Sequence, residues 1–170
     1  MCAASSPFCS AVASSEPVFL ADVLPEIEAQ LRSGRCVRIY PKGDSMEPML
    51  TGGRDSVLLA APPSRLRRFD LPLYRRESGQ FVLHRVVRVR GGCYDCCGDA
   101  QSVIEPGIRQ EQILAVAVGF CRRGKNRSCS GVFYLLYCLV WQLSRRFRQR
   151  LLRLWRRLAF GQANSSERGQ

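Results

Sequence analysis

Short apolar runs separated by turn residues limit the possible folds of this 170-residue chain more than any other feature. The clearest run is QFVLHRVVRVR, residues 80–90. It stops at Gly91 and Gly92, and a second run, CYDCCGDA, follows at residues 93–100. Two short runs joined by a glycine pair are typical of an antiparallel β-hairpin. We therefore expect a fold built on β-hairpins, with residues 80–90 as its strongest strand.

Other runs before residue 124 have the same character, and APPSRLRRFD, residues 61–70, is a loop between two of them. Apolar residues recur at helical spacing over residues 18–32 and stop at Ser33 and Gly34, with Pro25 marking a kink or a helix start. No helices alternate with the strands, so we do not expect a parallel sheet. We predict a mostly β domain with one short leading helix and roughly five to seven strands. The further strands are expected in residues 35–41, 55–60, 71–76 and 112–123.

Charge divides the chain into a domain and a tail. The net charge is +12, and residues 121–160 carry eleven Lys and Arg but no Asp or Glu. The residues before them are therefore close to neutral. We expect one domain over residues 17–124 and a basic helical tail over residues 125–160. Disordered ends are expected at residues 1–16 and 161–170.

The tail combines an apolar run with a basic amphipathic helix. Residues 131–143 are mostly apolar, and in residues 144–160 apolar side chains recur at helical spacing among arginines. We expect residues 131–160 to bind an anionic membrane surface. A protein partner is the alternative, and nucleic acid is not expected because few aromatic side chains lie between the arginines. The apolar face of the basic helix is formed by Phe147, Leu151, Leu154, Trp155 and Leu158.

The N-terminus and the cysteines indicate a reducing compartment. Residues 1–17 have neither the basic start nor the continuous apolar core of a secretory signal. The nine cysteines are an odd number, which does not favour a disulfide framework. The apolar run at residues 132–143 is shorter than the roughly 18–20 residues that span a bilayer. We expect a cytoplasmic protein with reduced thiols, peripheral at the inner membrane face.

Three cysteines lie close together in CYDCC. Cys93, Cys96 and Cys97 include one Cys-x-x-Cys pair, whereas a structural zinc site needs four ligands, usually from two such pairs. The chain has no second Cys-x-x-Cys. We expect no metal and no cofactor, and we interpret these cysteines as small strand residues.

The stretch KGDSMEPML, residues 42–50, raises the question of catalysis. A serine nucleophile such as Ser45 needs a base, and histidine is the usual base near neutral pH. The one histidine of the chain, His84, lies in VLHRVV. Each residue also has an ordinary interpretation, as a hydroxyl that stabilises a turn and as a histidine that fills a strand position.

A carboxylate would complete such a site by orienting the histidine. Asp99 follows Gly98 where the expected hairpin ends, so it can return beside the strand that holds His84. Glu105 lies six residues later, and Asp95 lies in mid-strand and is the weakest candidate. The residues alone leave the choice between Asp99 and Glu105 open.

A Gly-Asp-Ser esterase is a competing interpretation. That family needs an Asp-x-x-His motif near its C-terminus. The residue at that spacing before His84 is Phe81, so the esterase interpretation fails.

Five blocks occur in a specific order within residues 35–120: GDSMEPML, GGRDSVLL, LPLYRRESGQFVLHRVVRV, YDCCGDA and ILAVAVGF. The strongest signal is Ser-Met-x-Pro, followed 39 residues after the serine by His-Arg and then by Gly-Asp. This order resembles the signal peptidase I and LexA-type serine peptidase superfamily. Because His84-Arg85 stands where other branches have lysine, the chain is similar to the histidine branch, which includes endoplasmic-reticulum, archaeal and SipW-like signal peptidases.

The resemblance implies a compact β fold and a serine endopeptidase that cuts after small residues in an extended peptide or leader, without a cofactor. It implies that Ser45 is the nucleophile and His84 the general base. Asp99 matches the family's Gly-Asp, and Glu105 stands where the histidine branch has a second aspartate. The resemblance also implies substrate-groove and turn-shaping roles for Met46 and Pro48, respectively.

Three departures from the family pattern bear on this interpretation. Gly43 stands where the histidine branch often has a serine, so backbone N–H groups, that of Ser45 included, would stabilise the oxyanion. The letters GDSM are closer to the self-cleaving repressors. A helix pattern of moderate hydrophobicity, residues 18–32, stands where a membrane anchor usually precedes the domain. The alternatives are a non-catalytic scaffold and a self-cleaving regulator with a small-residue site near Ala11–Ser15.

Overall fold

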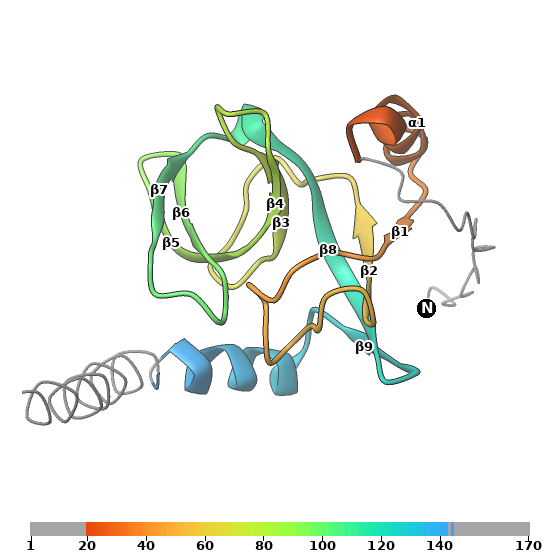
Figure 1. Ribbon diagram of the computed structural model, residues 1–170. Coiled ribbons are helices and arrows are strands. Elements are labelled where there is room, and N and C mark those ends of the chain that lie inside the picture. The colour runs from red at the N-terminus through yellow and green to blue at the C-terminus, as the bar shows by residue number, and fades with distance from the viewer. Residues whose placement is uncertain (1–19, 143, 145–170) are drawn as a thin grey trace, which may run out of the picture.

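The computed structural model describes residues 20–142 and 144, and within them the chain is mostly β (Figure 1). One α-helix, α1 (Leu20–Arg32), precedes the strands, a short 3-10 helix, η1 (Gln110–Gln112), precedes the longest strand, and residues 132–142 form a further helix. The predicted β class and leading helix are thus confirmed. The strands are β1 Val37–Ile39, β2 Ser56–Ala60, β3 Pro72–Arg75, β4 Phe81–Leu83, β5 Arg85–Arg90, β6 Cys93–Cys97, β7 Glu105–Ile108, β8 Ile113–Arg122 and β9 Lys125–Ser128.

The strands form two sheets. The larger has the order β1-β2-β8-β3-β4 with β9 also paired to β8, and the smaller has the order β5-β6-β7. Every strand pair in the described part of the chain is antiparallel, as expected from the lack of alternating helices. Figure 1 shows the smaller sheet curving beside β3 and β4, so that the two sheets enclose apolar side chains between them.

The helix prediction for residues 18–32 agrees with α1. Ile27 and Leu31, one turn apart, are buried against the larger sheet. Pro25 lies inside the helix and is exposed. Gly34 ends α1 with a φ of 78°, a left-handed conformation that glycine adopts without a steric penalty.

The prediction of one continuous strand over residues 80–90 is wrong. The run breaks at His84, where β4 ends and β5 begins, and the two strands belong to different sheets. The chain crosses between sheets there, and the His84 N–H donates to Pro72 O at 3.3 Å. The hydrophobic pattern does not reveal this crossing because both strands have buried apolar residues. The hairpin itself is confirmed, since β5 pairs with β6 across Gly91 and Gly92.

The expected boundary at residue 124 does not separate the domain from the chain that follows. β9 pairs with β8, and Tyr134 and Cys138 of helix 132–142 are buried in the larger hydrophobic core. The folded unit therefore includes most of the apolar run that we assigned to the tail. Our predictions for residues 1–16, 145–160 and 161–170 lie outside the described residues.

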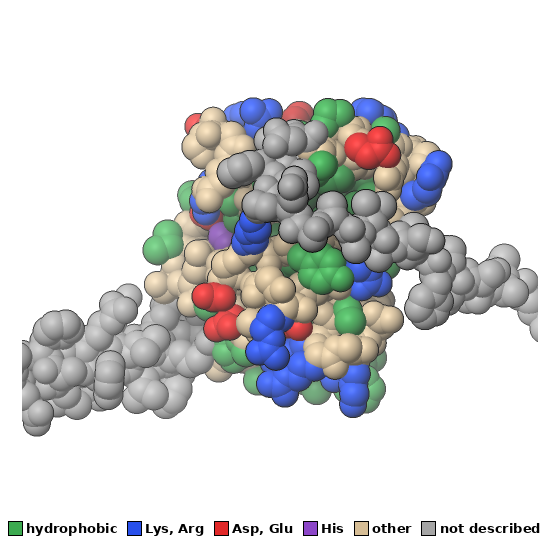
Figure 2. All heavy atoms as spheres, turned by 45° about the vertical axis from the view of Figure 1, so that its right-hand side comes forward, with side chains coloured by type: hydrophobic (Ala, Val, Ile, Leu, Met, Phe, Trp, Pro, Cys, Tyr) green, Lys and Arg blue, Asp and Glu red, His purple; other side chains and the backbone are tan. Residues whose placement is uncertain are grey.

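Basic side chains lie at both the upper and the lower end of the face shown in Figure 2. At the hairpin between β8 and β9, Arg123, Lys125 and Arg127 are exposed. Within residues 20–142 and 144, no helix is both long and apolar enough to cross a bilayer.

Candidate active site

Ser45 lies on a compact turn that the hydrophobic core holds in place. The Glu47 N–H donates to Asp44 O at 3.1 Å, and the Leu50 N–H donates to Met46 O at 3.0 Å. Leu50 is almost completely buried, so the far end of the turn is anchored. Ser45 itself is half-buried at the edge of this turn.

Two glycines allow the turn to pack closely against neighbouring backbone. A Cβ on Gly52 would lie 2.4 Å from the carbonyl oxygen of Gly43, and a Cβ on Gly98 would lie 2.5 Å from the carbonyl oxygen of Ser45. The Ala100 N–H donates to the same Ser45 oxygen at 2.9 Å. Ser45 is therefore held against the connection that leaves β6.

The strand register brings His84 toward the same place. Arg85 on β5 pairs with Cys97 on β6. One residue beyond this pair come His84 on one strand and Gly98 on the other. Gly98 also packs against the carbonyl oxygen of Ser45, so it links the Ser45 turn to the end of the β5–β6 pair that follows His84.

His84 is buried with its Nδ1 atom facing a tyrosine and a carboxylate. Its exposed fraction is 1%, and Nδ1 lies 3.2 Å from Tyr74 Oη and 3.3 Å from Glu105 Oε1. Burial lowers the pKa of His84, and the negative charge of Glu105 opposes that effect. The imidazole is therefore neutral near pH 7, which is the form that can accept a proton.

Glu105 is held in position by two side chains, Tyr74 on β3 and Arg76 directly after β3. Tyr74 Oη donates to Oε2 at 2.9 Å, and Arg76 donates through Nε to Oε2 at 2.8 Å and through Nη2 to Oε1. The hydrogen bonds from Arg76 are the main reason that the pKa of Glu105 lies below its usual value. Glu105 is thus a carboxylate at neutral pH.

These contacts favour one tautomer of His84. The Tyr74 hydroxyl proton is directed at Glu105, and Oε1 of Glu105 can only accept. A neutral imidazole protonated on Nδ1, with its lone pair on Nε2, satisfies both of these contacts. No described residue hydrogen-bonds to Nε2. A histidine arranged in this way has its basic nitrogen available and its other nitrogen oriented by a carboxylate.

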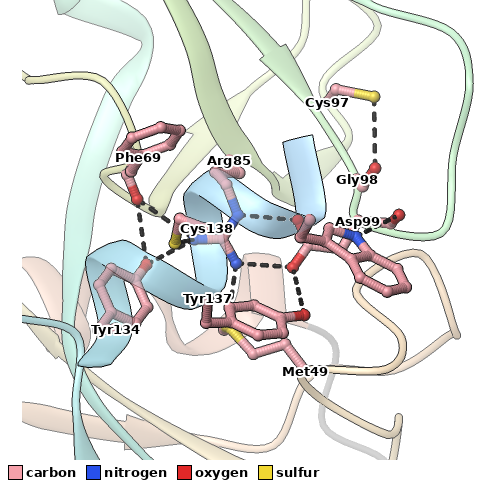
Figure 3. Close-up of polar contacts among 10 residues, drawn as sticks. Met49, Phe69, Arg85, Cys97, Gly98, Asp99, Tyr134, Tyr137 and Cys138 are labelled. Atoms are coloured by element: carbon pink, nitrogen blue, oxygen red, sulfur yellow. Dashed lines mark hydrogen bonds and ion pairs between the residues drawn. The ribbon is translucent and has the colours of Figure 1, made fainter. Parts of the chain in front are cut away.

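Asp99, the other carboxylate candidate, belongs to a buried ion pair (Figure 3). Arg85 donates through Nε to Oδ1 at 2.8 Å and through Nη2 to Oδ2 at 2.6 Å, and both side chains are completely buried. Burial alone would lower the pKa of Arg85, but the hydrogen bonds and the charge of Asp99 raise it. The remaining guanidinium contacts are Phe69 O, Tyr134 Oη, Cys138 Sγ and Met49 Sδ.

The contacts therefore distinguish the two acids that the sequence left open. Glu105 lies against the histidine ring, whereas Asp99 is bound by Arg85 and by Tyr137 Oη at 3.4 Å. Asp95 contacts the exposed side chains of Arg88 and Arg90 and is not part of the site.

Ser45 and His84, the candidate nucleophile and base, do not contact each other through a hydrogen bond in the described part of the chain. The backbone N–H of Ser45 also has no hydrogen-bond acceptor within that part. Catalytic hydrogen bonds are often long in free enzymes and shorten when substrate binds.

Met46 differs from our expectation of a groove residue, whereas Pro48 lies in the turn that we expected it to shape. Met46 is 4% exposed and is part of the larger hydrophobic core, so it supports the turn from below and does not line an open groove. Pro48 is exposed and follows a cis peptide bond with Glu47 inside the turn.

An open depression of about 620 Å³ lies beside Glu105. Arg76, Glu105 and residues 100–103 line it. Its wall includes Ala100, the residue bonded to Ser45 O, and Val103, an exposed apolar residue. Neither Ser45 nor His84 lines this depression, which reaches the site only through Glu105 and Ala100.

Thiols and acids do not form a metal centre in the described part of the chain, where no three His, Cys, Asp or Glu side chains are grouped to hold an ion. Cys93, Cys96 and Cys97 lie on β6. Burial raises the pKa of Cys96 to about 12, so it is a protonated thiol inside the smaller core.

Sequence reasoning missed Tyr74 and Arg76, which hold Glu105. The sequence could have indicated that Tyr74 and Arg76 act together, because residues two apart at the end of a strand point to the same face of a sheet. The pairing of Arg85 with Asp99 had no comparable local signal, since 14 residues and a hairpin separate them.

Comparison of the chain with family models, with curated proteins and with solved structures found no match.

Proposed function

We propose that this protein is a serine endopeptidase that hydrolyses peptide bonds through an acyl-enzyme. The observation that supports this proposal most is the contact of Glu105 with Nδ1 of the only histidine in the chain. The Ser45 turn packs against Gly98, which directly follows the strand pair Arg85–Cys97. This packing supports Ser45 as the nucleophile, because Arg85 is the neighbour of His84 in the chain. We further propose that the fold is of the signal peptidase and LexA type. The sequence segments that resemble this superfamily contain the Ser45 turn, His84, and the two residues that bind Glu105, Tyr74 and Arg76.

In the proposed mechanism Ser45 Oγ attacks the carbonyl carbon of the scissile bond while His84 Nε2 removes its proton. Glu105 accepts the hydrogen bond from Nδ1 and balances the charge of the imidazolium that forms. His84 then gives the proton to the leaving amine, and the C–N bond breaks. Water attacks the resulting ester with His84 again as the base, which releases the acid product and restores the Ser45 hydroxyl.

Stabilisation of the tetrahedral intermediate would come from the backbone. The Ser45 N–H has no acceptor within the described residues, and it is attached to the attacking residue itself. Removing one side-chain donor from an oxyanion hole typically raises the barrier by about 2.7–4 kcal/mol, which sets the scale for a preorganised N–H at this place. Gly43 contributes no side-chain donor, so the oxyanion depends on main-chain groups.

The experiment that tests this proposal uses a mixture of short synthetic peptides containing Ala, Ser and Gly at many positions, analysed by mass spectrometry. We expect cleavage after small residues by the full chain and no cleavage by Ser45→Ala. Ser78→Ala is the matched control because Ser78 is exposed on the turn between β3 and β4. Equal cleavage by the wild type and Ser45→Ala would exclude the mechanism.

The pH dependence gives a second test of the histidine base. Burial lowers the pKa of His84, so the base remains neutral to lower pH than an exposed histidine with a pKa near 6.5. We therefore expect kcat/KM to be constant near neutral pH and to fall tenfold per pH unit once His84 is protonated, with the midpoint below about pH 6.5. The measurement is the pH profile of peptide cleavage. A midpoint above pH 7.5 would contradict this assignment.

A second candidate is a non-catalytic scaffold or a self-cleaving regulator. It is favoured by the absence of a hydrogen bond between Ser45 Oγ and His84 within the described residues. The small-residue stretch Ala11–Ser15, where self-cleavage was considered, lies outside those residues. Intact mass of the purified protein distinguishes the three cases. A clip that Ser45→Ala prevents indicates self-cleavage, and an intact protein without peptide turnover indicates a scaffold.

A further inference from the structure

Helix 132–142 is fixed to the domain by one of its faces. Tyr134 and Cys138 are buried and both contact the guanidinium of Arg85. One turn further, Trp141 Nε1 donates to the carbonyl oxygen of Asp99 at 3.0 Å. Figure 3 shows Tyr134 and Cys138 projecting from the helix toward Arg85. Residues at positions i, i+4 and i+7 share a helix face, so the orientation of the whole helix is determined by this network.

The opposite face of the same helix is apolar and open. Phe133 is 90% exposed, and Leu136 and Val140, which follow it at helical spacing, are each more than half exposed. Residues 132–142 contain no charged side chain. Exposed apolar side chains gathered on one helix face mark a surface that binds another apolar phase. The other exposed apolar residues of the helix are Val132, Leu135 and Leu139.

Positively charged residues flank this apolar helix in the sequence. Before it, the β8–β9 hairpin exposes Arg123, Lys125 and Arg127 at the lower edge of the molecule, where the helix also lies (Figure 1). After it, residues 145–157 contain seven arginines, and no Asp or Glu occurs anywhere in residues 113–160. The exposed face of helix 132–142 is apolar, and the residues flanking it in the sequence are cationic, with no acidic side chain among them. Such a segment complements a surface that has anionic groups outside and an apolar phase beneath them.

We propose that helix 132–142 is an interfacial helix through which this protein binds the surface of an anionic lipid bilayer. Phe133, Leu136 and Val140 enter the region between headgroups and acyl chains, and the flanking cations contact the lipid phosphates. The helix lies in the plane of the surface, because its other face is occupied by the Arg85–Asp99 network. The inference does not depend on the peptidase activity.

One consequence does rest on the proposed function. Trp141 binds the carbonyl of Asp99, and the next residue, Ala100, donates to Ser45 O and lines the depression beside Glu105. A domain seated on lipid through this helix would hold its active site close to the membrane surface. Peptides emerging from or lying on that surface would then be the substrates within reach.

Flotation of the full chain with lipid vesicles tests the proposal. We expect the protein to float with vesicles of phosphatidylcholine and phosphatidylglycerol and to remain in the bottom fraction with phosphatidylcholine alone. The triple variant Phe133→Ser, Leu136→Ser, Val140→Ser should partition at least roughly tenfold less, since each substitution removes an apolar side chain from the interface. Tyr40→Ser, which removes a large exposed side chain from another part of the domain, should float like the wild type.

Three results would overturn the proposal. The first is a wild-type protein that stays unbound with anionic vesicles. The second is a triple variant that floats like the wild type, which would assign binding to the arginines alone. The third is a wild-type protein that elutes as a dimer, dissociates in the triple variant and does not float, which would assign the face to a second copy of the chain. Thermal unfolding of the triple variant should match the wild type, because the three side chains project away from the core.

Discussion

Replacing Glu105 by glutamine is expected to lower the kcat of the proposed peptidase by about 10⁴-fold. Glu105 Oε1 lies 3.3 Å from His84 Nδ1 and can only accept a hydrogen bond as a carboxylate. An amide at this position can donate to Nδ1 instead, which would place the imidazole proton on Nε2 and remove the base. The measurement is kcat and KM with a peptide found in the library screen. We expect the loss in kcat, since the substrate-binding surface changes little.

The pH profile separates an orienting role for Glu105 from a purely structural one. The charge of Glu105 raises the pKa of His84 against the effect of burial, so its removal should move the acidic limb of the residual activity to lower pH. Glu77→Gln, an exposed change on the turn after β3, is the control and should leave both kcat and the limb unchanged. A Glu105→Gln enzyme with wild-type kcat, together with a folded but inactive Asp99→Asn, would reverse the assignment of the two acids.

Removing Arg85 is expected to produce the largest loss of stability. In Arg85→Met, the carboxylate of Asp99 remains buried without its two hydrogen bonds at 2.8 and 2.6 Å. An uncompensated buried charge typically costs about 3–5 kcal/mol, a large fraction of the stability of a small domain. Urea unfolding monitored by circular dichroism would show the loss as a lower midpoint with little change in slope. Arg85→Met should also release helix 132–142, because Tyr134 and Cys138 lose the same partner.

Two further variants test the reason for that loss. Arg88→Met removes an arginine from the same strand whose 3.8 Å contact with Asp95 is at the surface, so its effect should stay below about 1 kcal/mol. Arg85→Met combined with Asp99→Leu removes both charges and should recover much of the lost stability, because no buried charge remains unpaired. A loss below about 1 kcal/mol in Arg85→Met alone would indicate that water reaches Asp99 and that the pair is not the structural centre we describe.

The local features of this fold were predictable because they depend on neighbours in the sequence. The glycine pair at residues 91–92 adopts two positive φ angles and turns β5 into β6. Apolar spacing identified α1, and the shortness of the apolar runs indicated an antiparallel, mostly β fold. The same local pattern failed at His84, where an apparently continuous strand passes from one sheet to another.

The expected end of the domain at residue 124 shows a related limit. The change in charge and hydropathy there is real, but β9 and helix 132–142 are part of the same folded unit. Composition describes what a segment exposes on average and not which of its faces is buried. Tyr134 and Cys138 could be placed in the core only when the position of Arg85 was known.

The sequence by itself determined the candidates: one histidine, one serine on a tight turn and two carboxylates downstream. Only the tertiary structure decided between the carboxylates, with Glu105 beside the histidine ring and Asp99 in the ion pair with Arg85. The reason is that residue types and turn chemistry act over a few positions, whereas the partner of a buried charge is set by how strands and helices pack. Arg76, directly after β3, binds Glu105 across 29 residues of chain, a separation over which no sequence period carries information.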